Sequence, residues 1–363
     1  MKSKTQRIIA LAVIVGACWN GVLTAHGQDA EQREAEAARA KDPAWKPKYK
    51  EVDLIKIGDG KNRGALRNFC LDAKGNILAC YAPGSPKNTP AKDAGIRVFS
   101  PKGDLLKTFP LEIRPSAICV GKDGSIFVAG DGKLLKLDAN GKVVASASSP
   151  VADLPVVITK EIEEMVKQSK RPVKEELEKM RGMMENRRGE VTGVAATSED
   201  VFMTVPTPNE FTYRVYRFDQ KLQNPKLVVE KLRGCCGQMD IQAHDGKLLI
   251  PHNARHTVEV RDREGAQLSK FGKAGKVKAT DFGGCCEPKN MRVLANGEYL
   301  VAESGPPTCI KRFSADGKFI EVVGLVTGES NCVRVTVDVS PDGKTFYMLD
   351  TTRDAIRVFG KKS

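Results

Sequence analysis

Residues 287–313 read EPKNMRVLANGEYLVAESGPPTCIKRF. Two short apolar runs, 290–295 and 298–303, flank the dipeptide Asn296-Gly297, and such pairs supply the positive φ that a tight hairpin needs. A third strand-like stretch, CIKRF, follows at 309–313. Short apolar runs between turn residues predict neighbouring antiparallel strands. The stretch therefore predicts one small sheet in which the chain runs back and forth.

The same unit recurs along the chain at intervals of roughly 45–50 residues, the length of one β-propeller blade. First strands are predicted near 66–72, 116–121, 191–197, 238–243, 290–295 and 334–340. Second strands are predicted near 76–81, 125–129, 200–205, 247–252, 298–303 and 345–350. Third strands are predicted near 95–100, 133–137, 213–219, 257–262, 309–313 and 355–359. We therefore predict an all-β, six-bladed β-propeller over residues 49–363.

The two ends of this region predict how the ring closes. The last repeat stops after its third strand, in AIRVFGKKS, while the strand in YKEVDLIKIG at 49–58 belongs to no hairpin. We expect this N-terminal strand to complete the last blade, which removes an exposed sheet edge. Residues 151–190 interrupt the repeats with a helical composition divided by Pro172. They predict a helical insertion that covers one face of the ring or meets a partner.

The N-terminal segment predicts export. Residues 1–27 combine a basic start with the short apolar run IIALAVIVGA, which is typical of a cleaved signal peptide. The sequence VGAC also allows lipidation at Cys18. Residues 28–48 are expected to form a charged linker or helix, and no later segment is apolar enough to span a membrane. We expect a secreted or periplasmic protein, with a lipoprotein as the alternative.

The net charge of +13 does not indicate nucleic-acid binding, because the basic residues are scattered and aromatic residues make up only 6% of the chain. We expect a monomer that binds an unidentified protein or small-molecule ligand.

Three cysteines occupy equivalent places in successive repeats. Cys236, Cys286 and Cys332 lie 50 and 46 residues apart. Cys235 and Cys285 precede two of them. Because equivalent positions of propeller blades converge on the axis, these thiols are expected at one mouth of the channel. The ends of the second strands, which include His252 and Glu303, are expected at the same mouth. The predicted metal ligands are Cys235, Cys236, Cys285, Cys286, Cys332, His252 and Glu303.

Several kinds of chemistry are open to this set. Thiolates with an imidazole suit zinc, copper(I) or an iron–sulfur cluster. Exported proteins also form disulfides, so the same cysteines could join adjacent blades or be inert. A catalytic thiol would require a cysteine beside His252.

The repeats resemble NHL-type six-bladed propellers and, more distantly, the gluconolactonase-like family. The stretches that carry the resemblance are EPKNMRVLANGEYLVAES at 287–304, VDVSPDGKTFYMLDTTRDAIRVF at 337–359 and NFCLDAKGNILAC at 68–80. The resemblance covers most of 51–360 and implies the fold. Proteins with such folds include lyases, lactonases and binding modules, so it does not select a function.

The gluconolactonase-like resemblance implies a divalent cation such as calcium, held by acids and asparagines near the axis. Asn290 falls where a family asparagine would lie, and Asp350 lies at a matching strand end. Peptidyl-amidoglycolate lyases, which are similar in fold, use axial histidines on zinc. Here His244, His252 and His256 lie in one blade, which argues against that activity.

Three functional hypotheses follow. The first is an exported binding module whose cysteine-lined mouth could hold a metal. The second is a metal-dependent, lactonase-like hydrolase. The third is a redox or metal-handling protein.

Overall fold

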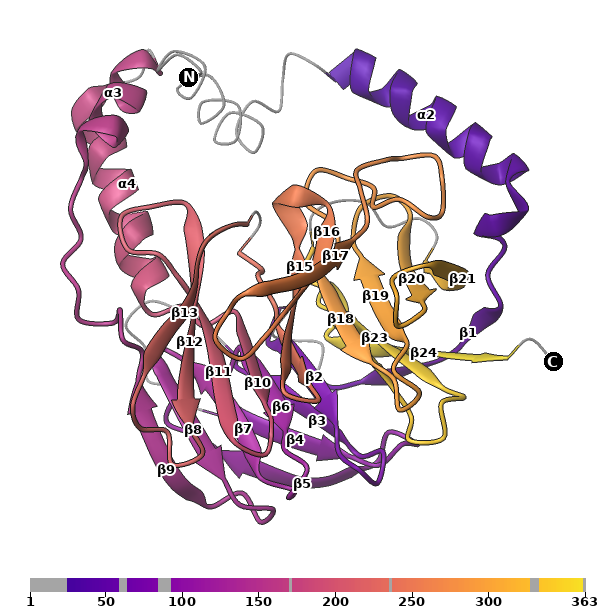
Figure 1. Ribbon diagram of the computed structural model, residues 1–363, viewed down its shortest axis with the longest axis horizontal. Helices are drawn as coiled ribbons and strands as arrows, with labels where there is room; N and C mark the ends of the chain where they lie inside the picture. The colour runs from indigo at the N-terminus through magenta and orange to yellow at the C-terminus, as the bar shows by residue number, and fades with distance from the viewer. Residues whose placement is uncertain are drawn as a thin grey trace.

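The computed structural model describes residues 25–58, 64–83, 93–169, 172–234, 237–326 and 333–361. It confirms the predicted six-bladed β-propeller, because the strands form six four-stranded antiparallel sheets (Figure 1). The first strand of each sheet contacts the first strands of the two neighbouring sheets, so these inner strands complete a ring.

The blades follow one another in chain order. Blades 1 to 3 consist of β2 (Leu66–Leu71), β3 (Ile77–Tyr81), β4 (Gly95–Phe99) and β5 (Leu105–Pro110); β6 (Ala117–Val120), β7 (Ile126–Gly130), β8 (Lys133–Leu137) and β9 (Val143–Ser148); and β10 (Gly193–Ala196), β11 (Asp200–Pro206), β12 (Thr212–Asp219) and β13 (Lys226–Arg233).

Blades 4 to 6 consist of β14 (Gln242–His244), β15 (Lys247–His252), β16 (Thr257–Arg261) and β17 (Gln267–Phe271); β18 (Asn290–Val293), β19 (Tyr299–Glu303), β20 (Thr308–Phe313) and β21 (Phe319–Val326); and β22 (Val337–Val339), β23 (Phe346–Asp350), β24 (Ala355–Lys361) and β1 (Tyr49–Lys56). Strand β14 is shorter than the predicted strand at 238–243, because only Gln242, Ala243 and His244 pair with β15.

The apolar core of the protein lies between blades. Each seam between two neighbouring blades contains its own cluster of buried apolar side chains, contributed by the facing sheets. A single four-stranded sheet could not bury these faces, so each blade depends on both neighbours.

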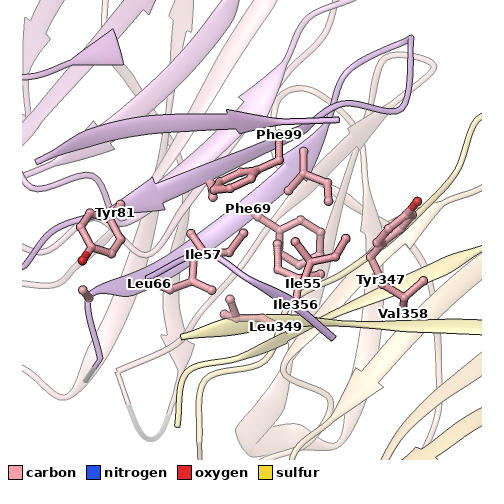
Figure 2. Packing of buried hydrophobic residues seen from close by; sticks show 13 residues of the cluster. Ile55, Ile57, Leu66, Phe69, Tyr81, Phe99, Tyr347, Leu349, Ile356 and Val358 are labelled. Atoms are coloured by element: carbon pink, nitrogen blue, oxygen red, sulfur yellow. The ribbon is translucent and has the colours of Figure 1, made fainter. Parts of the chain in front are cut away.

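The N-terminal strand closes the ring as predicted. Strand β1 pairs antiparallel with β24, and Ile55 lies opposite Ile356. Figure 2 shows Ile55 and Ile57 packed with Leu66 and Phe69 of blade 1, so the closing strand also contributes to the seam between blades 6 and 1.

The predicted helical insertion is also present. Helices α3 (Lys160–Gln168) and α4 (Val173–Arg188) pack against each other through Ile162, Val166, Met180 and Met184. The Thr159 side chain accepts a hydrogen bond from Ile162 N at 3.4 Å and caps α3. Helix α4 contacts strand β11 of blade 3.

A third helix, α2 (Ala25–Lys41), precedes the ring and continues into the short helix η1 (Pro43–Trp45). The Trp45 indole donates to Val277 O at 2.7 Å, and Arg39 Nη1 donates to Lys276 O at 2.6 Å. These bonds attach the segment to the loop that joins blades 4 and 5, and Trp45 also packs against Cys309 and Val322 of blade 5. In Figure 1, α2 and the α3–α4 pair rise on opposite sides of the same face of the ring.

No helix in the described ranges is long and apolar enough to span a bilayer. The predicted signal peptide and Cys18 lie almost wholly outside those ranges, so export and lipidation stay predictions.

Replacement of Ile55 by Ala tests the closure. Ile55 is 5% exposed, so we expect the substitution to lower the free energy of unfolding by about 2–5 kcal/mol. Val52 on the same strand is 51% exposed, so Val52→Ala should change the free energy of unfolding by about 0.5 kcal/mol or less. Urea denaturation measures both, and equal effects would show that β1 does not stabilise the ring.

Candidate functional site

The inner strands place polar side chains at the ring axis. Asn68, Asp240, Asn290 and Thr336 stand at equivalent positions of four blades, and all are buried. Thr336 Oγ1 donates to Asn68 Oδ1 at 2.8 Å, which joins blades 6 and 1. Asn290 Nδ2 donates to Asp240 Oδ2, which joins blades 5 and 4. These positions form paired contacts between blades and do not form an open ring of ligands.

A buried arginine lies next to these pairs. Arg292, two residues beyond Asn290, lies 3.7 Å from Asp240 and 3.4 Å from Asp338. Burial lowers the pKa of Arg292, but the carboxylates of Asp338 and Asp240 outweigh that effect and raise it. Burial raises the pKa of Asp240 to about 6, although Arg292 and the Asn290 hydrogen bond oppose the shift.

A cavity of about 400 Å³ opens at the mouth of the channel, where the inner strands begin. Its polar lining comes from four blades and the end of the insertion: Arg67, Ser116, Glu190, Thr192, Arg334 and Thr351.

Arg334 is anchored by two carbonyl groups from other blades. Its Nη1 donates to Ser116 O and its Nη2 to Gly237 O, both at 3.0 Å. Within the described part of the chain, neither Arg334 nor Arg67 has a carboxylate oxygen within ion-pair distance. The buried Nε of Arg67 also has no hydrogen-bond partner there.

Positively charged side chains lie close together at the channel mouth and affect one another's pKa values. Burial lowers the pKa of Arg67, and the positive charges of Arg334 and Arg114 lower it further. Burial also lowers the pKa of Arg334, although Asp240 and Glu190 oppose this. Glu190 is itself buried enough that its pKa is raised, which weakens its ability to neutralise the arginines. An anion at this mouth would relieve the repulsion between the two guanidinium groups.

The predicted thiol site is only partly described. Cys235, Cys236 and Cys332 lie outside the described residues. Cys285 is exposed and Cys286 is buried, with their sulfur atoms 3.1 Å apart. Lys289 Nζ lies 3.0 Å from the Cys286 sulfur.

The two remaining predicted ligands are both engaged with protein groups. His252 Nε2 accepts from Arg233 N at 3.0 Å, so Nδ1 carries the proton that is donated to Glu259 at 2.7 Å. Glu303 forms a buried ion pair with Lys311 at 2.5 Å. Among the residues whose placement is described, no group of three His, Cys, Asp or Glu side chains could hold a metal ion. The metal assignment therefore stays a prediction.

Four further cysteines, Cys70, Cys80, Cys119 and Cys309, are free thiols. Burial raises the pKa of Cys80 strongly and that of Cys119 to about 12, so neither is an activated nucleophile. No disulfide joins two cysteines within the described ranges.

The residues present do not fit the divalent cation that the gluconolactonase-like resemblance implies. Asn290 Oδ1 already accepts from Val337 N at 2.8 Å, and Asp240 is bonded by Asn290 and flanked by Arg292. Asp350 pairs with Arg357 at 2.9 Å. Positive side chains thus occupy the surroundings that a cation would need.

Comparison with known proteins supports the fold alone. No family model and no curated protein matches the chain. Solved structures do match, including a protein of unknown function from Bacteroides thetaiotaomicron (12% identity, TM-score 0.55, 87% of this chain and 75% of that one). A putative gluconolactonase matches at 11% identity and TM-score 0.52, over 85% of this chain and 92% of that one. The calcium-binding protein regucalcin from Agrobacterium tumefaciens matches at 10% identity and TM-score 0.51, over 86% and 95%. The expected likeness to gluconolactonase-like propellers is confirmed at the level of fold.

The raised pKa of Asp240 predicts a pH-dependent stability. Its carboxyl group has a pKa of about 6 here and 3.8 ordinarily, so the folded protein favours the protonated form. The stabilisation of the folded protein by the protonated Asp240 carboxyl group is fully present below about pH 4. It is lost as the pH rises through about 6. The wild type should therefore lose stability relative to Asp240→Asn between pH 4 and 7, measured by urea denaturation.

The exposed Asp316, whose pKa is lowered to about 2, provides the control. The difference in the free energy of unfolding between the wild type and Asp316→Asn should stay constant over the same pH range. Parallel curves for the wild type and Asp240→Asn would refute the assignment.

Proposed function

We propose that this protein is a ligand-binding propeller whose channel mouth binds a small organic anion through Arg67 and Arg334. The observation that supports this most strongly is the pair of guanidinium groups lining one cavity without a carboxylate partner among the described residues. A guanidinium presents a planar fork of donors that matches a carboxylate or phosphate.

The cavity suits a small ligand. Its volume of about 400 Å³ lies within the range typical of small-molecule sites. The two carbonyl groups that hold Arg334 fix the direction of its guanidinium before any ligand arrives, which lowers the entropy lost on binding. Glu190 and Thr351 in the same lining would bind hydroxyl groups of the ligand. A polyhydroxylated acid therefore matches the lining better than an apolar one.

A lactonase-like hydrolase is the second candidate. The structural match to a putative gluconolactonase supports the fold of such an enzyme, and the Asp240 pKa of about 6 is of the kind that general bases have. Opening of a lactone yields a hydroxy acid, whose carboxylate would suit the two arginines. We rank this candidate second because Asp240 is already bonded by Asn290 and flanked by Arg292.

A soft-metal or redox function at the predicted cysteines is the third candidate, and export through residues 1–27 belongs to all three. Metal analysis of the purified protein separates them. Zinc, copper or iron bound through sulfur would favour the third, and stoichiometric calcium with lactone hydrolysis would favour the second. Anion binding by a protein that contains none of these metals would favour the first.

Substitution of Arg67 tests the anion site. We expect gluconate, succinate or inorganic phosphate to bind, and Arg67→Gln to weaken binding roughly 10- to 100-fold, because a hydrogen bond to a charged group contributes about 1.5–3 kcal/mol. Arg334→Gln should weaken it at least as much. Isothermal titration calorimetry at low ionic strength measures these affinities.

Two controls make the test specific. Lys122, whose side chain is 83% exposed, can be changed to Gln and should leave the affinity unchanged. Sorbitol, the uncharged counterpart of gluconate, should bind far more weakly. The proposal fails if none of the three anions binds, or if Arg67→Gln binds them as the wild type does.

A further inference from the structure

The adjacent cysteines Cys285 and Cys286 bring their sulfur atoms together. Side chains of consecutive residues in an extended strand point to opposite faces, and adjacent cysteines ordinarily do not meet. Here the loop before β18 turns so that the two sulfurs are 3.1 Å apart. One sulfur belongs to an exposed residue and the other to a buried one. A reagent in solvent can therefore reach Cys285, whose sulfur contacts that of the buried Cys286.

The loop that carries the pair is anchored on the end of β19. Gly283 N donates to Glu303 Oε2 at 2.7 Å. Glu287 Oε1 accepts from Ser304 Oγ at 2.8 Å and from Gly305 N at 2.7 Å. Gly284 has a φ of +68°, and a β-carbon there would lie 3.2 Å from Glu287 Cγ, so a larger residue would strain the turn. These contacts hold both cysteines in their present orientation.

A buried ammonium group contacts the inner sulfur. Lys289 is fully buried, and its Nζ lies 3.0 Å from Cys286 Sγ. A cation at this distance orients the sulfur by a hydrogen bond and stabilises negative charge that develops on it. Exposed and buried thiols in contact, with a cation beside the buried one, are the parts that a dithiol switch requires.

This pair is separate from the proposed anion site, because neither cysteine nor Lys289 lines the cavity at the channel mouth. We propose that Cys285 and Cys286 are a redox-active pair that closes to a vicinal disulfide by exchange with a small-molecule disulfide.

The exchange has two steps. The exposed Cys285 thiolate attacks one sulfur of the small disulfide, forms a mixed disulfide and releases one small thiolate. The Cys286 thiolate then attacks the Cys285 sulfur, forms the Cys285–Cys286 bond and releases the second small thiolate. The two cysteines lose two electrons and two protons, and the reagent gains them as two thiols.

Peptide mapping of the full-length protein tests the proposal. Trypsin releases residues 279–289, ATDFGGCCEPK, which contain both cysteines and no other. After incubation of the folded protein with oxidised glutathione, we expect this peptide to be about 2 Da lighter than its reduced form. Neither cysteine should react with iodoacetamide until the protein is reduced.

Two variants separate the roles of the cysteines. In Cys286→Ser the second step cannot occur, so Cys285 should retain glutathione as a stable mixed disulfide. In Cys285→Ser, which changes an exposed residue, the buried Cys286 should remain unmodified. Cys309, a buried free thiol in the same blade, is the internal control and should stay reduced in every sample.

Other results would overturn the proposal. A disulfide that links this peptide to one containing Cys235, Cys236 or Cys332 would show that the cysteines join blades instead. A peptide that keeps two reactive thiols throughout the incubation would show that the pair is not redox-active. The wild-type map decides between these outcomes even if a variant does not fold.

Discussion

The six inner strands meet around one axis, and the polar groups that they bury there must find partners inside the protein. This constraint governs the centre of the molecule. Asn68 bonds to Thr336 across the seam between blades 6 and 1, and Asn290 bonds to Asp240 across the seam between blades 5 and 4. The axial side chains thus connect the blades at the centre, while the apolar clusters connect them farther out.

The same constraint explains the chemistry of the channel mouth. Arg334 satisfies two of its donors with the carbonyl groups of Ser116 and Gly237, which position it but do not neutralise it. Arg67 lies close enough for its pKa to be lowered by that charge. Positive charge held in partial burial favours an anion and disfavours a divalent cation. The likeness to the putative gluconolactonase and to regucalcin concerns the fold alone.

Much of the fold was predictable, because its determinants are local. Asn-Gly and Asp-Gly turns locate the hairpins. The last repeat lacks a fourth strand and the N-terminal strand belongs to no hairpin, which together imply the closure by β1. The outer strands of blades 1 to 5 were not predicted. Strand β5 illustrates the cause, since five of its six residues are exposed and it lacks a clear apolar pattern.

The candidate site was much less predictable. Repeat equivalence places Cys285 and Cys286 near the channel, but it does not say where each side chain points. His252 was expected at a metal and instead bonds to Glu259 on the neighbouring strand, because strand pairing brings the two together. Arg67 and Arg334 were overlooked among scattered basic residues. Their places just before the axial residues Asn68 and Thr336 were the available signal.

The proposed anion site is formed by the two arginines at the channel mouth. Crystals soaked in sodium bromide test it directly, because bromide is an anion whose position is revealed by anomalous scattering. We expect a strong bromide peak between the guanidinium groups of Arg67 and Arg334. Bromide bound elsewhere on the surface, with no peak at the mouth, would contradict it.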